Sequence, residues 1–292
     1  MEALKKKIQS AQELFTLVRT MKALAAVNIR QYETALSALR YYFATVETGL
    51  QAVLPMRPRG TKKDIQAKQT LGYIVFGSDQ GMCGSFNEQI IETARDSIEE
   101  AQNHGDLVTV ITVGERMAYA FGDELYQAFP LPAQVKGITT SVQEILAAVD
   151  TWQQEKKTAK IRILYNQPRR STGFQTILTQ FLPIDEDWFN QVAHKKWPSK
   201  QIPLTTMETT ILLSRFISQY LFASLHRIFA ESLAAENAGR LAAMQAAEKN
   251  IEELLGELTG QYNKERQSQI TEELLDIIAG FDTIKKNKII TA

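Results

Sequence analysis

Apolar residues recur every three or four positions from the start of the chain to residue 53. The steps alternate between four and three, and Lys22 is the only charged residue in the series. This heptad repeat places the side chains in one seam along a helix, and such a seam must be buried against a partner helix. Pro55 ends the segment, since proline cannot continue a helix. The pattern predicts a coiled-coil helix over residues 1–55. The seam consists of Leu4, Ile8, Ala11, Phe15, Val18, Lys22, Ala25, Ile29, Tyr32, Leu36, Leu39, Phe43, Val46, Leu50 and Val53.

The C-terminal region carries a second long helical pattern. It runs from about Thr205 to Ala279, and no proline follows Pro203. Its apolar spacing is less regular than that of the first helix, which indicates different packing partners along its length. We assign residues 205–284 to a C-terminal coiled-coil helix. Antiparallel pairing would bury the seam of residues 1–55 and leave part of the longer helix overhanging.

Residues 70–183 alternate between strand and helix patterns, after a polar connector over residues 56–69. Such alternation is typical of an α/β domain with a mostly parallel sheet. The sequence therefore predicts an α/β fold in which a small Rossmann-like domain accompanies the long antiparallel coiled coil. The predicted strands are Leu71–Phe76, Leu107–Val113, Ala159–Tyr165 and Phe174–Leu182. The predicted helices are Phe86–His104, a short one within Gly114–Gly122, and Val142–Gln154.

The charge balance changes this picture little overall but matters locally. The chain has 33 basic and 33 acidic residues and a formal net charge of zero, which argues against nucleic-acid binding through a broad basic face. Residues 1–30 carry six basic and two acidic side chains, whereas residues 231–260 carry six acidic and two basic ones. Complementary patches of this kind suit helix pairing or an oppositely charged partner.

Several classes of protein are excluded or disfavoured by composition. Cys83 is the only cysteine, so the chain has no internal disulfide. No run of 18 apolar residues predicts a membrane span. Lys5–Lys7 are followed by no apolar signal region, so we expect no secretory signal.

The segment Gly77–Gly84 is the strongest candidate for chemistry, since it follows a strand and opens a helix. Phosphate groups bind at this position in many α/β proteins. However, the spacing fits neither GxGxxG nor GxxxxGK[ST], and the segment has no lysine. We therefore favour a tight structural turn, formed with Ser78, Asp79, Gly81, Cys83 and Gly84, over the alternative of a nucleotide site.

The other candidate groups favour structural roles. Cys83 could be a reactive thiol at a helix N-terminus, but no histidine or second cysteine is near it in sequence, so a small structural residue is favoured. His104, His194 and His226 show no metal-ligand spacing. Ser171 and Thr172, after two arginines, could bind an anion but more simply form a solvated turn. The acidic pairs at 252–253 and 272–273 suit solvated helix faces better than catalysis. Nothing resembles a self-contained active site.

Four segments resemble the γ subunit of F-type ATP synthases, in the same order along the chain. Residues 262–274 (YNKERQSQITEEL) are similar to the family's Y-N-K-x-R-Q-x-x-I-T-x-E-L signature, which is long and specific. Residues 236–244 (ENAGRLAAM) resemble its S-E-x-A-x-R-M-x-A-M segment. Residues 20–26 (TMKALAA) and 78–87 (SDQGMCGSFN) resemble an N-terminal A-M-x-M-V-A-A stretch and an S-D-R/K-G-L-C-G-x-x-N turn. The resemblance covers nearly the whole chain.

This resemblance implies a central rotor shaft that is not catalytic by itself. It implies α and β subunits of a catalytic head, an ε subunit and a membrane c-ring as partners, with ATP, ADP and Mg bound by α and β rather than by this chain. It implies a peripheral location on the cytoplasmic side of a bacterial inner membrane or an equivalent coupling membrane. The family's contacts with β carry over to Met21, Lys22, Arg266, Gln267 and Thr271. No cofactor, metal or catalytic residue is implied for this chain.

Some positions depart from the family pattern. Residues 206–213 (TMETTILL) replace an E-P-x-x-x-x-L-L region, and residues 281–292 run beyond the usual ending. These departures indicate a divergent paralogue. Two other hypotheses are a coiled-coil adaptor or tether, which would explain the helices but not the signature, and a nucleotide-dependent α/β enzyme, which would not explain the seam.

Overall fold

The computed structural model describes residues 1–56, 70–156, 158–169, 173–197 and 206–290. Residues 57–69 of the predicted connector, together with Ser171 and Thr172, therefore lie outside the described residues. The chain forms two compact units: Met1–Ala23 with Met244–Ala292, and Leu24–Ala243. Among the described residues, no helix combines the length and apolar character needed to cross a membrane.

Two long helices, α1 (Glu2–Val53) and α6 (Thr209–Ile290), contribute to both units. None of the predicted seam residues of α1 is exposed. Within the first unit, Met1 contacts Glu265 and Lys22 contacts Glu248, so that rising numbers on α1 meet falling numbers on α6. The antiparallel pairing of the terminal helices is thus confirmed. Helix α1 ends in a 3₁₀ turn, Leu54–Met56, that contains Pro55.

The second unit contains a five-stranded sheet with the order β3-β2-β1-β4-β5. Neighbouring strands are parallel except for the antiparallel pair β4 and β5. The predicted fold class, an α/β domain with a mostly parallel sheet and a coiled coil of terminal helices, is confirmed. The strands are β1 (Thr70–Phe76), β2 (Leu107–Val113), β3 (Leu125–Phe129), β4 (Thr158–Pro168) and β5 (Phe174–Leu182).

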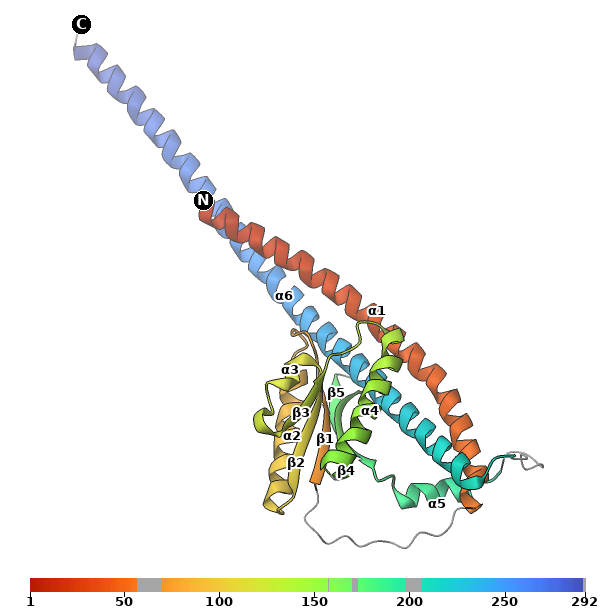
Figure 1. The fold of residues 1–292 in the computed structure, drawn as a ribbon. Coiled ribbons are helices and arrows are strands. Elements are labelled where there is room, and N and C mark those ends of the chain that lie inside the picture. Colours follow the sequence, from red (N-terminus) through yellow and green to blue (C-terminus); the bar gives the residue numbers. More distant parts are fainter. Residues whose placement is uncertain (57–69, 157, 170–172, 198–205, 291–292) are drawn as a thin grey trace. The chain divides into compact units, whose positions relative to one another are not determined.

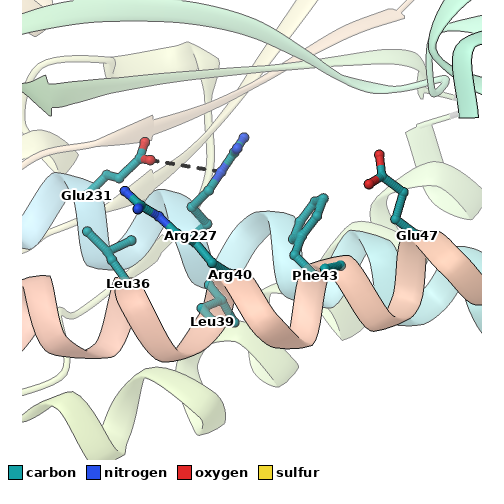
Figure 2. A pocket seen from close by; sticks show the side chains of 8 residues that line it. Leu36, Leu39, Arg40, Phe43, Glu47, Arg227 and Glu231 are labelled. Atoms are coloured by element: carbon teal, nitrogen blue, oxygen red, sulfur yellow. Dashed lines mark ion pairs between the residues drawn. The ribbon is translucent and has the colours of Figure 1, made fainter. Parts of the chain in front are cut away.

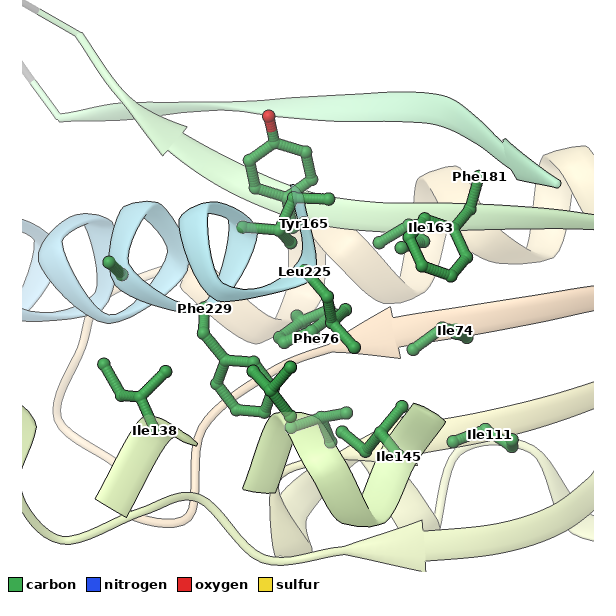
Figure 3. Packing of buried hydrophobic residues seen from close by; sticks show 14 of the residues in the cluster. Ile74, Phe76, Ile111, Ile138, Ile145, Ile163, Tyr165, Phe181, Leu225 and Phe229 are labelled. Carbon is green, nitrogen blue, oxygen red and sulfur yellow. The ribbon is translucent and has the colours of Figure 1, made fainter. Parts of the chain in front are cut away.

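Helices cover both faces of this sheet (Figure 1). Successive side chains of a strand point to opposite faces, and β1 supplies both cores. Ile74 and Phe76 pack with α4 (Ile138–Lys156) and α6, whereas Tyr73 and Val75 pack with α2 (Phe86–Asn103) and α3 (Glu115–Ala118). Figure 3 shows the first of these cores, with Phe229 of α6 beside Phe76 and Ile138. The sheet is therefore attached to α6 through its own hydrophobic core.

Two elements were missing from the sequence prediction. The prediction of four strands was wrong, since the sheet has a fifth strand, β3. It was missed because β3 is a short edge strand (LYQAF) without a buried apolar run. Asp185 caps the N-terminus of helix α5 (Glu186–His194), since its Oδ1 accepts a hydrogen bond from the Asp187 backbone N–H at 3.0 Å. Phe189 and Val192 of α5 pack with the C-terminal end of α1. Helix α6 also continues beyond residue 284, the predicted end, to Ile290.

His226 of α6 gives a pH-dependent prediction. It is half-buried, its Nδ1 has no hydrogen-bond partner among the described residues, and burial lowers its pKa from the ordinary 6.5. The unfolded chain therefore takes up this proton first, and the free energy of unfolding falls as the pH drops through 6.5. We expect His226→Leu to remove this part of the pH dependence, measured by urea unfolding across that range. Equal slopes for wild type and His226→Leu would contradict the prediction.

Candidate functional site

The turn after β1 is held by a buried network of hydrogen bonds. The Ser78 backbone N–H donates to Asn87 Oδ1 at 3.0 Å, and Asn87 Nδ2 donates back to Ser78 Oγ at 2.8 Å. Met82 and Gly84 have positive φ angles of 60° and 65°, which reverse the chain before α2. This reciprocal pairing between the turn and the first turn of α2 fixes the shape of the segment.

Asp79 ties the same turn to the neighbouring strand ends. Its Oδ1 accepts a hydrogen bond from the Glu115 backbone N–H at 2.8 Å, at the start of α3. Its Oδ2 accepts from the Leu131 backbone N–H at 3.1 Å, after β3. One carboxylate thus satisfies backbone donors of two separate loops, a structural use that needs no bound ligand.

Helix α6 packs directly onto this turn through Gly239 and Arg240. A Cβ atom at Gly239 would lie 2.7 Å from the Cys83 carbonyl oxygen, so no side chain fits there without a shift. Arg240 Nη2 donates to the carbonyl oxygens of Gln80 and Gly81 at 3.4 and 3.5 Å. Protein atoms therefore fill the α6-facing side of the turn, which favours the structural interpretation over a nucleotide site there.

The charge at this contact is buried. Glu236 and Arg240 have side chains only 7% and 10% exposed and form an ion pair at 2.7 Å. Burial raises the pKa of Glu236, and Arg240 counteracts that rise. Burial and the Glu236 charge likewise raise the pKa of Tyr32, on α1. The pair is therefore costly to desolvate and depends on both partners.

Cys83 lies in the same buried region. Its exposed fraction is 2%, and burial is the main cause that raises the pKa of its thiol. A reactive cysteine needs the opposite shift, because the thiolate is the nucleophile. The geometry agrees with a small structural residue in the turn.

The predicted contact residues of α1 lie at the helix pair of the first unit. Met21 is half-buried, and the ammonium group of Lys22 forms an ion pair with Glu248 of α6. Arg19 Nε also approaches Glu248, at 3.5 Å. Part of the basic N-terminal patch is thus used for helix pairing, one of the two uses that its charge pattern suggested. The sequence analysis did not identify Glu248, although the i, i+3 spacing of the two cations on one helix was visible.

The predicted contact residues of α6 are solvent-exposed. Arg266, Gln267 and Thr271 follow Glu265, which pairs with the Met1 ammonium group at 2.8 Å. Thr271 Oγ1 donates to the Gln267 carbonyl oxygen at 2.8 Å, within the helix. These residues and Met21 lie at separate levels of the helix pair, because Lys22 lies opposite Glu248 rather than Glu265. Large apolar side chains also remain exposed here, namely Ile270, Leu274, Leu275, Ile277 and Ile278.

A group of exposed large apolar side chains on one helix is typical of a surface that contacts another protein. Among the described residues, no group of three or more His, Cys, Asp or Glu side chains is arranged to hold a metal ion. Residues 266–278 of α6 offer groups suited to contact with a partner: apolar side chains, a guanidinium and an amide.

Comparisons with known proteins agree with this geometry. A family model described as ATP synthase matches residues 1–284. The "ATP synthase gamma chain" of Nitratiruptor sp. is 27% identical, covering 97% of this chain and 98% of the relative, and that of Actinobacillus succinogenes is 28% identical, covering 95% and 96%. A chain in the Euglena gracilis mitochondrial ATP synthase (OSCP/F1/c-ring) has the same fold, with a TM-score of 0.67 at 20% identity over 98% of this chain and 95% of that one. The chain belongs to the ATP synthase γ-chain family.

Proposed function

We propose that this chain is the central-stalk rotor of an F-type ATP synthase, coupling ion flow through a membrane c-ring to rotary catalysis in an α/β head. The observation that carries the proposal is the exposed end of α6, where Arg266 and Gln267 follow Glu265, the residue that pairs with the Met1 ammonium group. Helix α6 thus has a partner as far as Glu265, and its side chains are exposed from Arg266 to Ala279. Such an exposed helix end suits a shaft that other subunits surround. The chain is non-catalytic, and the transported ion is a proton or sodium ion.

The contacts with β subunits are proposed for two levels of the shaft. Arg266, Gln267 and Thr271 form the level on α6. No described residue bonds the guanidinium or the amide, so both can bond carboxylates or carbonyl oxygens of a partner. Met21 and Lys22 form the other. Since Lys22 already pairs with Glu248, an acidic loop of β would share or compete for its ammonium group. The charge pattern thereby supports attraction that varies as the shaft turns.

The remaining partners follow from the same proposal. We expect contacts with the ε subunit and the c-ring, and a peripheral location on the cytoplasmic side of a bacterial inner membrane or an equivalent coupling membrane. ATP, ADP and Mg would be bound by the α and β subunits. The turn at Ser78–Gly84 would carry torque between α6 and the α/β domain, since Gly239 and Arg240 of α6 pack on it.

Co-expression with cognate α and β subunits tests the proposal. We expect a stable assembly that hydrolyses Mg-ATP, with turnover reduced by about fivefold to tenfold in the Arg266→Ala/Gln267→Ala variant. The reason is that removing two partner-facing hydrogen-bonding groups costs about 1–1.5 kcal/mol of coupling between shaft and head. Steady-state hydrolysis of the purified assembly measures it.

The matched control changes an arginine and a glutamine elsewhere. Arg95 and Gln89 lie on the exposed face of α2, and their double alanine variant should assemble and turn over like wild type. Failure of the wild-type chain to assemble with any α/β pair would overturn the proposal. Unchanged turnover in the Arg266→Ala/Gln267→Ala variant would overturn the assigned contact.

A further inference from the structure

A groove of about 290 Å³ lies between α1 and α6 within the unit Leu24–Ala243. Leu36, Leu39 and Phe43 of α1 provide apolar walls. Figure 2 shows Arg40 of α1 and Arg227 of α6 between Glu231 at one end of the view and Glu47 at the other. The groove shares no lining residue with the Gly77–Gly84 turn or with the proposed β-subunit contacts on α1 and α6.

Both carboxylates of the groove bond to residues outside it. Glu47 Oε1 accepts a hydrogen bond from Lys195 Nζ at 2.6 Å. Glu231 Oε2 accepts one from Gln167 Nε2 at 3.1 Å. Their negative charge is therefore only partly available to the arginines of the groove.

The two guanidinium groups are left with unused donors. Arg40 is exposed and forms no hydrogen bond or ion pair with any described residue. Arg227 Nε reaches Glu231 only at 4.0 Å, and its guanidinium carbon lies 5.6 Å from the centroid of the Phe43 ring. A stacked guanidinium is held in place while its edge remains free to bind an oxyanion. The groove thus presents one guanidinium stacked on Phe43 and one without a partner among the described residues, both beside apolar walls.

We propose that this groove binds a carboxylate side chain, flanked by an apolar side chain, from a partner protein of the rotor's complex. Arginine binds carboxylates through two parallel hydrogen bonds, and Leu36, Leu39 and Phe43 would cover the apolar neighbour. The volume suits one or two side chains and lies just below the range usual for small-molecule ligands. This proposal rests on the proposed function in one respect: the partner is sought among the subunits of the rotor's complex.

Site-specific photo-crosslinking in the assembled complex tests it. A benzophenone amino acid replaces Ala44, an exposed residue that lines the groove, in the full chain co-expressed with its cognate subunits. The expected product is one partner peptide in which Asp or Glu adjoins an apolar residue. Arg40→Glu and Arg227→Glu should each lower the yield about tenfold, and charge reversal of the partner's carboxylate should restore it in the Arg40→Glu background.

Two controls make the result decisive. The same probe at Tyr41, which is 80% exposed and does not line the groove, should not give that product. Arg215→Glu, at an exposed arginine of α6, should leave the yield unchanged. A product without an acidic residue, or one insensitive to both groove variants, overturns the proposal. An assembly that hydrolyses Mg-ATP but gives no product at Ala44 overturns the groove alone, whereas failure to assemble overturns the proposed function and the groove with it.

Discussion

Replacing Glu236 with alanine is expected to lower the free energy of unfolding of the α/β unit by about 3–5 kcal/mol. The variant leaves the Arg240 guanidinium buried without its ion-pair partner, and Arg240 Nε already has no hydrogen bond among the described residues. The remaining acceptors are the backbone carbonyls of Gln80 and Gly81, at 3.4 and 3.5 Å. Urea unfolding of the isolated chain, followed by tryptophan fluorescence, measures the loss.

The matched control removes both charges. A Glu236→Leu/Arg240→Met variant keeps side-chain volume without a buried charge, and replacing a buried ion pair by apolar groups is often close to neutral. We expect it to lose less stability than Glu236→Ala. If the double variant is the less stable of the two, the cost lies in the lost contacts of Arg240 with the turn rather than in its unpaired charge.

The terminal helices were predictable because one rule governs α1. A heptad seam specifies a buried stripe on a helix, whatever the partner helix is. Seam residues between Ala11 and Leu50 are buried at many of these positions. Strands β1 and β2 were also predictable, since each is an apolar run bounded by polar or glycine residues. Strand β3 was not predictable, because each of its residues is half-buried or exposed and so leaves no apolar run in the sequence. It is a strand because its backbone pairs with β2. Tertiary context outweighed local preference there.

The contacts of the site were less predictable than its residues. The signature residues 236–244 were identified by resemblance, but their packing on the Gly77–Gly84 turn depends on residues more than 150 positions apart. The same holds for Lys22, which the sequence assigned to a partner and the structure pairs with Glu248. No spacing rule predicts such contacts, because they arise from how the helices and sheet pack. The assigned contacts with β subunits stay a prediction.

The hydrophobic attachment of α6 to the sheet leads to the second large effect. Phe229→Ala is expected to lower the free energy of unfolding by about 3–5 kcal/mol, as for other buried phenylalanines. Phe229 is fully buried and meets Phe76 of β1 edge-to-face, with ring centroids 4.8 Å apart (Figure 3). Its loss leaves a cavity at the centre of the core that joins α6, α4 and the sheet. Urea unfolding of the isolated chain measures the effect.

Tyr119→Ala provides the control, since it removes an aromatic ring that is 93% exposed and should change stability by no more than about 0.5 kcal/mol.

The assembled complex adds a second measurement. If the α/β domain transmits torque through α6, Phe229→Ala should reduce ATP-driven ion transport more than Mg-ATP hydrolysis, because a loosened core lets the helix turn without the domain. Equal losses in both would mean that Phe229 maintains folding alone and that the contact of Arg240 with the Gly77–Gly84 turn carries the connection.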